Sequence, residues 1–166
     1  MIGRFIKDNG FTLVELIVVV VIMMVLVGVG SMSLNNFNNQ KDLEAARNDV
    51  SGHLKLARNL AITKQLPGSV TNLKFVGVNI VSNGVTIVGV DDVGITYPAS
   101  PYSKLTINTK NGVTVGVYNF GFSKSTGRLT DRDGNLIGTT MTVVLSRGTD
   151  ERKISISNLG VISNVD

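Results

Sequence analysis

The hydrophobic pattern of the chain falls into three parts, and the first is a nearly unbroken apolar run. Residues 16–30 contain no charged or hydrogen-bonding side chain. As a helix, residues 11–34 would be roughly 36 Å long, enough to cross the hydrocarbon core of a bilayer. Because backbone groups in lipid must be satisfied internally, a helix is favoured despite the many valines. Arg4 and Lys7 precede the run and the next cation is Lys41, so the positive-inside bias predicts a cytoplasmic N-terminus.

The second part has the period of an amphipathic helix. Residues 35–40 (NNFNNQ) are a polar break, and beyond them apolar residues recur at steps of three or four. These residues are Leu43, Ala46, Val50, Leu54, Ala57 and Ala61. Their spacing predicts a helix over about residues 41–64 with one apolar face, ended by Pro67 and Gly68. If residues 35–40 are also helical, the two segments form one long stalk whose second half belongs to the head.

The third part alternates apolar and polar residues with a period of two and is rich in β-branched residues. The segments on either side of Asn83 and Gly84 predict a hairpin with a type I′ turn. Further hairpins are expected around residues 110–112 and around residues 148–150. Such a sheet needs a cover for its apolar face, and the amphipathic helix supplies one. The sequence therefore predicts an α+β fold in which a long N-terminal α-helix packs on an antiparallel β-sheet head.

Composition agrees with a chain made of one domain and an appendage. We expect a leader at residues 1–10, an apolar transmembrane helix at 11–34, the amphipathic half of the stalk at 35–66 and a β-rich head at 67–166. The chain has no cysteine, which excludes disulfides and thiolate metal sites. Its formal net charge is +4, with Lys and Arg scattered rather than clustered, so nucleic acid is not predicted as a partner.

One carboxylate, Glu15, lies at the start of the apolar run. An uncleaved signal anchor, or a secretory signal peptide cut near residues 27–33, leaves this acid unexplained, and an ordinary interfacial Glu is the simplest alternative. If the chain is instead cut between Gly10 and Phe11, the new amine of Phe11 lies four residues from Glu15. The two opposite charges could then satisfy each other in lipid, within one chain or between neighbours. Gly10 would give a peptidase free access to the backbone.

The segment GFTLVEL, residues 10–16, resembles the prepilin cleavage and methylation motif of type IV pilins and type II secretion pseudopilins. The similarity covers the short basic leader, the glycine and the apolar helix that follows. It implies cleavage after Gly10 by an inner-membrane prepilin peptidase and N-methylation of Phe11. It also implies that Glu15 neutralises the N-terminal amine of a neighbouring subunit during assembly.

The remainder of the chain resembles the GspH/FimT group of minor pseudopilins and minor pilins. The similar segments are residues 53–65 (HLKLARNLAITKQ), 120–129 (FGFSKSTGRL) and 152–162 (RKISISNLGVI). One departure from many major pilins is that no proline precedes Pro67, so only Gly28 and Gly30 weaken the first helix. Local melting of that helix in a filament is therefore less expected here.

A basic surface is another candidate site, because some FimT-type minor pilins bind DNA through arginines in the C-terminal tail. The candidates are Arg128, Arg132, Arg147, Arg152 and Lys153. No cation follows Lys153, which weakens a direct role in DNA uptake. We prefer a solvated sheet edge whose charges discourage aggregation.

Other candidate sites are weak. Residues 131–135 (DRDGN) cluster oxygen ligands, but Gly and Glu do not occupy the positions of an EF-hand loop, so a tight turn is the better interpretation. Asp91 and Asp92 indicate a solvated loop, and the single histidine, His53, indicates a helix surface. Without a nucleophile–base pair or a metal constellation, we predict no catalytic residue, no metal, no cofactor and no enzyme activity.

The sequence therefore predicts a structural subunit, of the minor kind, of a type IV pilus or a type II secretion pseudopilus. Its expected partners are other pilin or pseudopilin subunits, the prepilin peptidase, the inner-membrane assembly platform and, before assembly, membrane lipid. It would begin in the inner membrane and end in a periplasmic or cell-surface filament. The alternatives are a membrane-anchored extracellular binding module that never polymerises, and a DNA-uptake minor pilin.

Overall fold

The computed structural model describes residues 11–65, 72–98, 104–106 and 112–165, and of residues 29–34 it describes the backbone only. The chain divides into two compact units, Met1–Asn38 and Asn39–Asp166, each of which is described by itself. The leader expected at residues 1–10 lies outside the described residues. The four-part division made from the sequence stays a prediction.

A single helix, α1 (Leu13–Thr63), accounts for all the helical structure described. Residues 35–40 are helical, so the polar break in the sequence does not end the helix. After Thr63, Lys64 adopts a positive φ of 57°, the left-handed conformation in which many helices end. Pro67 and Gly68, which were expected to stop the helix, lie outside the described residues.

The strands of the second unit form two sheets in which every described pairing is antiparallel. The first sheet has the order β3-β2-β1-β6-β7, with β4 also paired to β2. Its strands are β1 (Leu73–Val81), β2 (Gly84–Asp91), β3 (Thr96–Pro98), β4 (Lys104–Thr106), β6 (Tyr118–Ser123) and β7 (Leu129–Thr130). The second sheet has the order β10-β9-β8-β5. Its strands are β5 (Thr114–Val115), β8 (Met141–Arg147), β9 (Asp150–Ile156) and β10 (Ile162–Val165).

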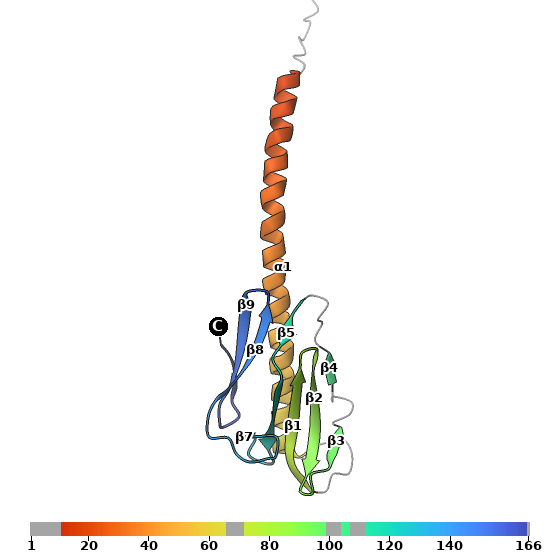
Figure 1. The fold of residues 1–166 in the computed structure, drawn as a ribbon, viewed down its shortest axis with the longest axis vertical. Coiled ribbons are helices and arrows are strands. Elements are labelled where there is room, and N and C mark those ends of the chain that lie inside the picture. Colours follow the sequence, from red (N-terminus) through yellow and green to blue (C-terminus); the bar gives the residue numbers. More distant parts are fainter. Residues whose placement is uncertain (1–10, 66–71, 99–103, 107–111, 166) are drawn as a thin grey trace, which may run out of the picture. The chain divides into compact units, whose positions relative to one another are not determined.

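The C-terminal part of α1 runs alongside both sheets (Figure 1), and one hydrophobic core joins it to them. The helix contributes Leu43, Val50, Leu54, Ala57, Leu60 and Ala61, all buried. The first sheet adds Phe120 and Phe122, whose rings meet edge to face at 5.9 Å, and the second sheet adds Leu145 and Ile154. The predicted α+β fold is confirmed, with the difference that the β residues form two sheets.

The first predicted hairpin exists, but its turn lies one residue earlier. Val81 pairs with Gly84, so the turn residues are Ser82 and Asn83, and neither has the positive φ that a type I′ turn requires. Gly84 is instead the first residue of β2. A Cβ built there would lie 2.7 Å from the carbonyl oxygen of Leu105 in β4. The glycine therefore permits the close approach of a neighbouring strand.

The hairpin predicted around residues 110–112 is wrong, whereas the one around residues 148–150 is confirmed. The strand before the first turn, β4, pairs with β2, and the strand after it, β5, pairs with β8 in the other sheet. The stretch expected to be one strand, residues 113–120, is divided between β5 and β6. By contrast, Arg147 pairs with Asp150, and β8 and β9 form a regular hairpin.

Candidate assembly site

The described chain begins with an exposed Phe11 and a reciprocal cap on α1. The backbone N–H of Thr12 donates to Glu15 Oε2 at 2.9 Å, and the backbone N–H of Glu15 donates to Thr12 Oγ1 at 3.3 Å. The Thr12 hydroxyl also donates to Glu15 Oε2 at 2.8 Å. This arrangement is a capping box, which satisfies backbone donors that the first turn of a helix leaves unpaired.

Thr12 is thus a capping residue of the candidate site, and the sequence analysis did not single it out. The signal was present, because Thr-x-x-Glu immediately before an apolar run is the sequence signature of a capping box. The cap also explains part of the position of Glu15, since an acid in the first turn interacts favourably with the helix dipole. Of the three predicted site residues, Phe11 and Glu15 are described, and Gly10 lies outside the described residues.

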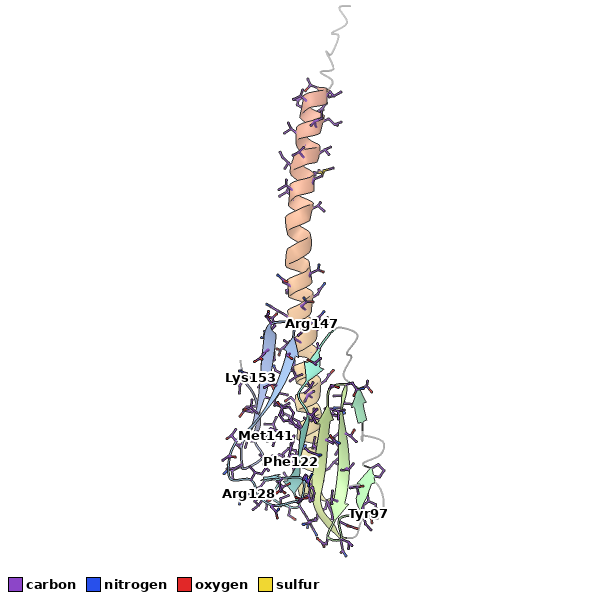
Figure 2. All side chains as sticks on the ribbon, in the orientation of Figure 1. Tyr97, Phe122, Arg128, Met141, Arg147 and Lys153 are labelled. Carbon is purple, nitrogen blue, oxygen red and sulfur yellow. The ribbon has the colours of Figure 1, made fainter. Side chains whose placement is uncertain are left out.

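Beyond Glu15 the helix presents an apolar surface on all sides. Every large apolar side chain from Leu13 to Val27 is exposed, from 43% at Val20 to 73% at Leu13. Side chains project from both visible sides of this part of α1 (Figure 2). A helix that is hydrophobic all round is typical of one that is surrounded by other apolar groups. This surface is therefore the part of the described structure best suited to contact with further helices or with lipid.

The membrane span predicted over residues 11–34 includes residues 29–34, whose side chains lie outside the description. Within the described part of the chain, no helix combines the length and the apolarity that crossing a membrane requires.

The cations of the head do not combine into one basic surface. Arg147 Nη1 lies 2.5 Å from Asp42 Oδ2, and Arg152 Nε lies 3.6 Å from Glu44 Oε2. Two others pair with acids beside them in the sequence, Arg132 with Asp133 at 3.6 Å and Lys153 with Glu151 at 3.7 Å. Arg128, Arg147 and Lys153 lie at separate places on the head (Figure 2). Four of the five candidate cations are thus paired with an acid.

Asp91 is buried and organises the loop between β2 and β3. Its Oδ1 accepts hydrogen bonds from the backbone N–H groups of Val93 at 3.0 Å and Ile95 at 2.8 Å, and its Oδ2 accepts one from the Tyr97 hydroxyl at 3.2 Å. Burial alone would raise the pKa of this carboxyl, but these hydrogen bonds together hold its pKa below the ordinary value. Asp91 is therefore a structural residue of the loop, whereas Asp92 is exposed as expected.

Asp131 has the same role in the loop of residues 131–135. Its carboxylate accepts hydrogen bonds from the Asn135 side chain at 3.0 Å and from the backbone N–H groups of Asn135 and Asp133 at 2.8 and 2.9 Å. These bonds, the one from the Asn135 side chain first, lower the pKa of Asp131. Among the described residues, no group of three or more His, Asp or Glu side chains comes together as a metal site. His53 lies half-buried on α1.

Comparison with known proteins bears on the N-terminal segment and on the fold. A family model described as the prokaryotic N-terminal methylation motif matches residues 6–31, the segment that holds Gly10, Phe11 and Glu15. No curated protein sequence matches the chain. Among solved structures, the type IV minor pilin FimU of Pseudomonas aeruginosa is similar, with a TM-score of 0.53 and 20% sequence identity. The similarity covers 75% of this chain and 93% of the FimU chain.

The chain has a pilin-like fold, and its N-terminal segment matches the methylation motif. The two findings are separate, because the family model covers only the start of the chain, whereas the similarity of fold to FimU extends over most of it. The pilin-like fold explains why a chain of this length has a long helix before its sheets. Its capped, apolar N-terminal segment is the candidate assembly site.

Proposed function

We propose that this chain is a prepilin-type structural subunit that assembles into a helical filament through the N-terminal segment of α1. It is cleaved between Gly10 and Phe11 by a prepilin peptidase, methylated on the amine of Phe11, and inserted into the filament from the inner membrane by an assembly platform. Before assembly the apolar run of residues 16–30 is held in lipid, with the N-terminus on the cytoplasmic side.

The observation that carries the proposal is the exposed apolar surface of α1, which follows directly on a methylation motif. Between Glu15 and Lys41 the sequence has no charged residue. So large an apolar surface is rare on a soluble monomer and indicates a site of interaction. Bundled against the same segment of neighbouring subunits, these side chains would be covered by close packing.

Glu15 has one carboxylate oxygen to spare for a neighbour. Its Oε2 accepts both hydrogen bonds from Thr12, whereas no hydrogen bond from a described residue reaches its Oε1. The methylated amine of an adjacent subunit would pair with this second oxygen. In a dry bundle, any register that leaves either charge alone is strongly penalised, so the pair would fix the position of each new subunit.

The similarity to FimU favours a minor subunit of a type IV pilus over a subunit of a type II secretion pseudopilus. The other partners follow from the same proposal: further pilin subunits in the filament and membrane lipid before assembly. The finished filament would lie in the periplasm or at the cell surface. The ion pairs that engage most of the head's candidate cations give no support to DNA uptake or to a separate binding module.

The intact mass of the cell-associated protein tests the processing. We expect loss of residues 1–10 and gain of one methyl group on Phe11. A membrane-anchored binding module that never polymerises would instead be recovered uncut. Recovery of an uncut chain in cells with an active prepilin peptidase would overturn the proposal.

Substitution of Glu15 tests the assembly step. Glu15→Val should leave the protein in the membrane and abolish its incorporation into filaments, measured by quantifying the subunit in sheared filaments against the membrane fraction. Glu15→Gln is the matched variant, because it keeps an oxygen that can accept from Thr12 and removes the charge. If Glu15→Gln assembles as well as the parent, the charge pair does not set the register.

A further inference from the structure

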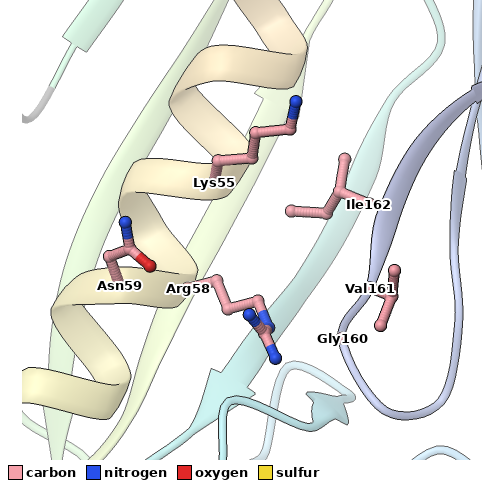
Figure 3. A pocket seen from close by; sticks show the side chains of 6 residues that line it. All are labelled: Lys55, Arg58, Asn59, Gly160, Val161 and Ile162. Carbon is pink, nitrogen blue, oxygen red and sulfur yellow. The ribbon is translucent and has the colours of Figure 1, made fainter.

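Two segments far apart in the sequence line one cavity of the head, and a third segment lies next to them. The cavity has a volume of about 300 Å³ and is lined by Lys55, Arg58, Asn59, Gly160, Val161 and Ile162. The first three residues belong to α1 and the others to the end of the β9–β10 turn and the start of β10 (Figure 3). The turn between β6 and β7 lies against one of these lining residues, Arg58, at Gly127. These are the same three segments that carry the resemblance to the minor pilins.

Two glycines allow the turns to close over Arg58. Gly127 and Gly160 have positive φ values of 63° and 75°, a conformation that side chains rarely adopt. A Cβ built at Gly127 would lie 3.1 Å from Arg58 Cγ, and one at Gly160 would lie 3.0 Å from Arg58 Nε. The Cβ at Gly160 would also collide with the carbonyl oxygen of Gly127. The backbone is therefore shaped around this arginine.

Arg58 is not satisfied by the part of the chain that the structure describes. Its Nε is buried and has no hydrogen-bond partner there. Its guanidinium points from the helix toward Gly160, while the ammonium of Lys55 lies toward Ile162 (Figure 3). Among the described residues, no acid forms an ion pair with either cation. A buried unpartnered donor is costly, and more so when it is charged.

Unlike Arg58, another arginine of α1 forms an ion pair with an acid of the chain. On the same helix, Arg47 Nη2 lies 2.7 Å from Glu44 Oε1. The last described residues turn to that arginine as well, since Arg47 Nη1 donates to the carbonyl oxygen of Val165 at 3.4 Å. Strand β10 thus leads from the cavity at Ile162 toward Arg47, away from Arg58. It supplies apolar side chains to the cavity and no carboxylate.

We propose that this cavity binds the carboxylate of a small ligand that has a short apolar chain. The planar guanidinium of Arg58 offers parallel N–H donors that match a carboxylate, and Lys55 supplies a second positive charge. Asn59 lies beside them in the lining of the cavity. Val161 and Ile162 then cover the carbon chain of the ligand. A phosphate ion has no carbon chain and would leave these two side chains uncovered. This binding site goes beyond the proposed role in a filament and does not depend on it.

The test is a titration of the full-length protein in non-ionic detergent at low ionic strength, followed by NMR of the Arg58 Nε–H and the Gly160 amide. Butyrate should produce a saturable shift of both signals. Acetate should bind several-fold more weakly, because it leaves the apolar wall uncovered. Arg58→Gln should weaken butyrate binding by about tenfold or more, the effect expected on losing a charge-assisted hydrogen bond.

Matched variants separate a site from a general effect of charge. Lys55→Met should weaken binding, Arg58→Lys should restore only part of the affinity, and Lys41→Met, which removes an exposed cation from the same helix, should leave it unchanged. If Arg58→Gln fails to fold, Lys55→Met decides. The proposal is overturned if butyrate gives no saturable shift, if phosphate binds as tightly as butyrate, or if Lys41→Met loses as much affinity as Lys55→Met.

Discussion

The two ends of helix α1 carry similar apolar residues in opposite surroundings. In the first unit, Leu26 and Ile22 are 66% and 53% exposed. In the second unit, Leu43 and Leu54 are completely buried against the two sheets. Both sets of residues belong to one continuous helix, and neither set differs in chemical type from the other. The difference lies in what the chain itself provides to cover them.

The comparison shows that the head covers its own apolar residues, whereas the first segment of α1 leaves its apolar residues exposed. Each core residue of the head finds its neighbours within the chain, so its burial contributes to the free energy of folding. The apolar side chains of residues 13–27 stay exposed, so most of the same contribution becomes available only when another apolar surface covers them. Stability should therefore depend on one end of α1 and assembly on the other.

The sharpest way to break this comparison is to make the same truncation at both ends. Leu54→Ala should lower the free energy of unfolding of the head by about 2–5 kcal/mol, because it removes buried methyl groups and leaves a cavity. Leu26→Ala should leave the unfolding of the head unchanged. Denaturant unfolding of the full chain in detergent, followed by the signals of the strands, measures both.

The effects of the two substitutions on assembly into filaments should have the reverse order. Leu26→Ala should reduce the amount of subunit in sheared filaments, while Leu54→Ala should act there only through the amount of folded protein. A loss of head stability on Leu26→Ala that matches the loss on Leu54→Ala would show that the two ends of α1 are not energetically separate.

The helix was well predicted from the sequence because its two halves have different but simple patterns. Steps of three and four placed Leu43, Val50 and Leu54 on one face, and the structure buries all three. Ala46 was placed on the same face and is only half-buried, because it lies at the edge of the contact. Periodicity identifies a face, but packing decides how far its edge extends.

The sheets were less predictable because alternation does not say which strand is the partner. Residues 113–120 alternate as one strand, yet the chain passes from the second sheet to the first within them. Part of the reason is Tyr118, whose hydroxyl oxygen accepts a hydrogen bond from the Val144 N–H at 3.1 Å, in β8. Such a contact between residues distant in the sequence leaves no trace in the local pattern.

The candidate sites show the same limit. The Thr12–Glu15 cap is local and could have been read from the sequence. The environment of Arg58 could not, because it depends on two glycines in separate turns that meet only in the folded head. The positions of Gly10, Phe11 and Glu15 in a methylation motif remain predictions about chemistry that the peptidase and the neighbouring subunits would complete.

A smaller effect is expected in the pH dependence of the stability of the head. Because hydrogen bonds hold the pKa of Asp91 below its ordinary value of 3.8, ionised Asp91 stabilises the folded head. That contribution is complete above the unfolded pKa and is lost as the pH falls through the lower folded pKa, so the head should lose stability below about pH 4. Asp91→Asn should lower the stability of the head at neutral pH. It should also reduce the loss of stability on acidification, called here the acid limb of the stability curve. Thermal unfolding measured across the acid range gives both values.

Asp92→Asn is the matched control, since Asp92 is exposed and adjacent. It should follow the acid limb of the parent. The pKa of Asp131 is also lowered, so part of the acid limb should remain in Asp91→Asn. Only the double variant Asp91→Asn, Asp131→Asn should remove most of it. An acid limb identical in the parent and in Asp91→Asn would refute the assignment of Asp91.

The smallest effect is expected at the start of α1, where the cap can be removed without touching the head. Thr12→Ala removes the oxygen that accepts from the Glu15 N–H and should cost about 1 kcal/mol of helix stability, confined to the first turn. Amide exchange at residues 13–16 should then accelerate about fivefold, and Thr12→Ser should restore the parental rate because it keeps the hydroxyl. Exchange in the strands should not change in either variant. Equal amide exchange rates in Thr12→Ala and the parent would mean that the first turn is stabilised by its surroundings rather than by the Thr12–Glu15 cap. The only remaining role of Glu15 would then be the one proposed for it between subunits.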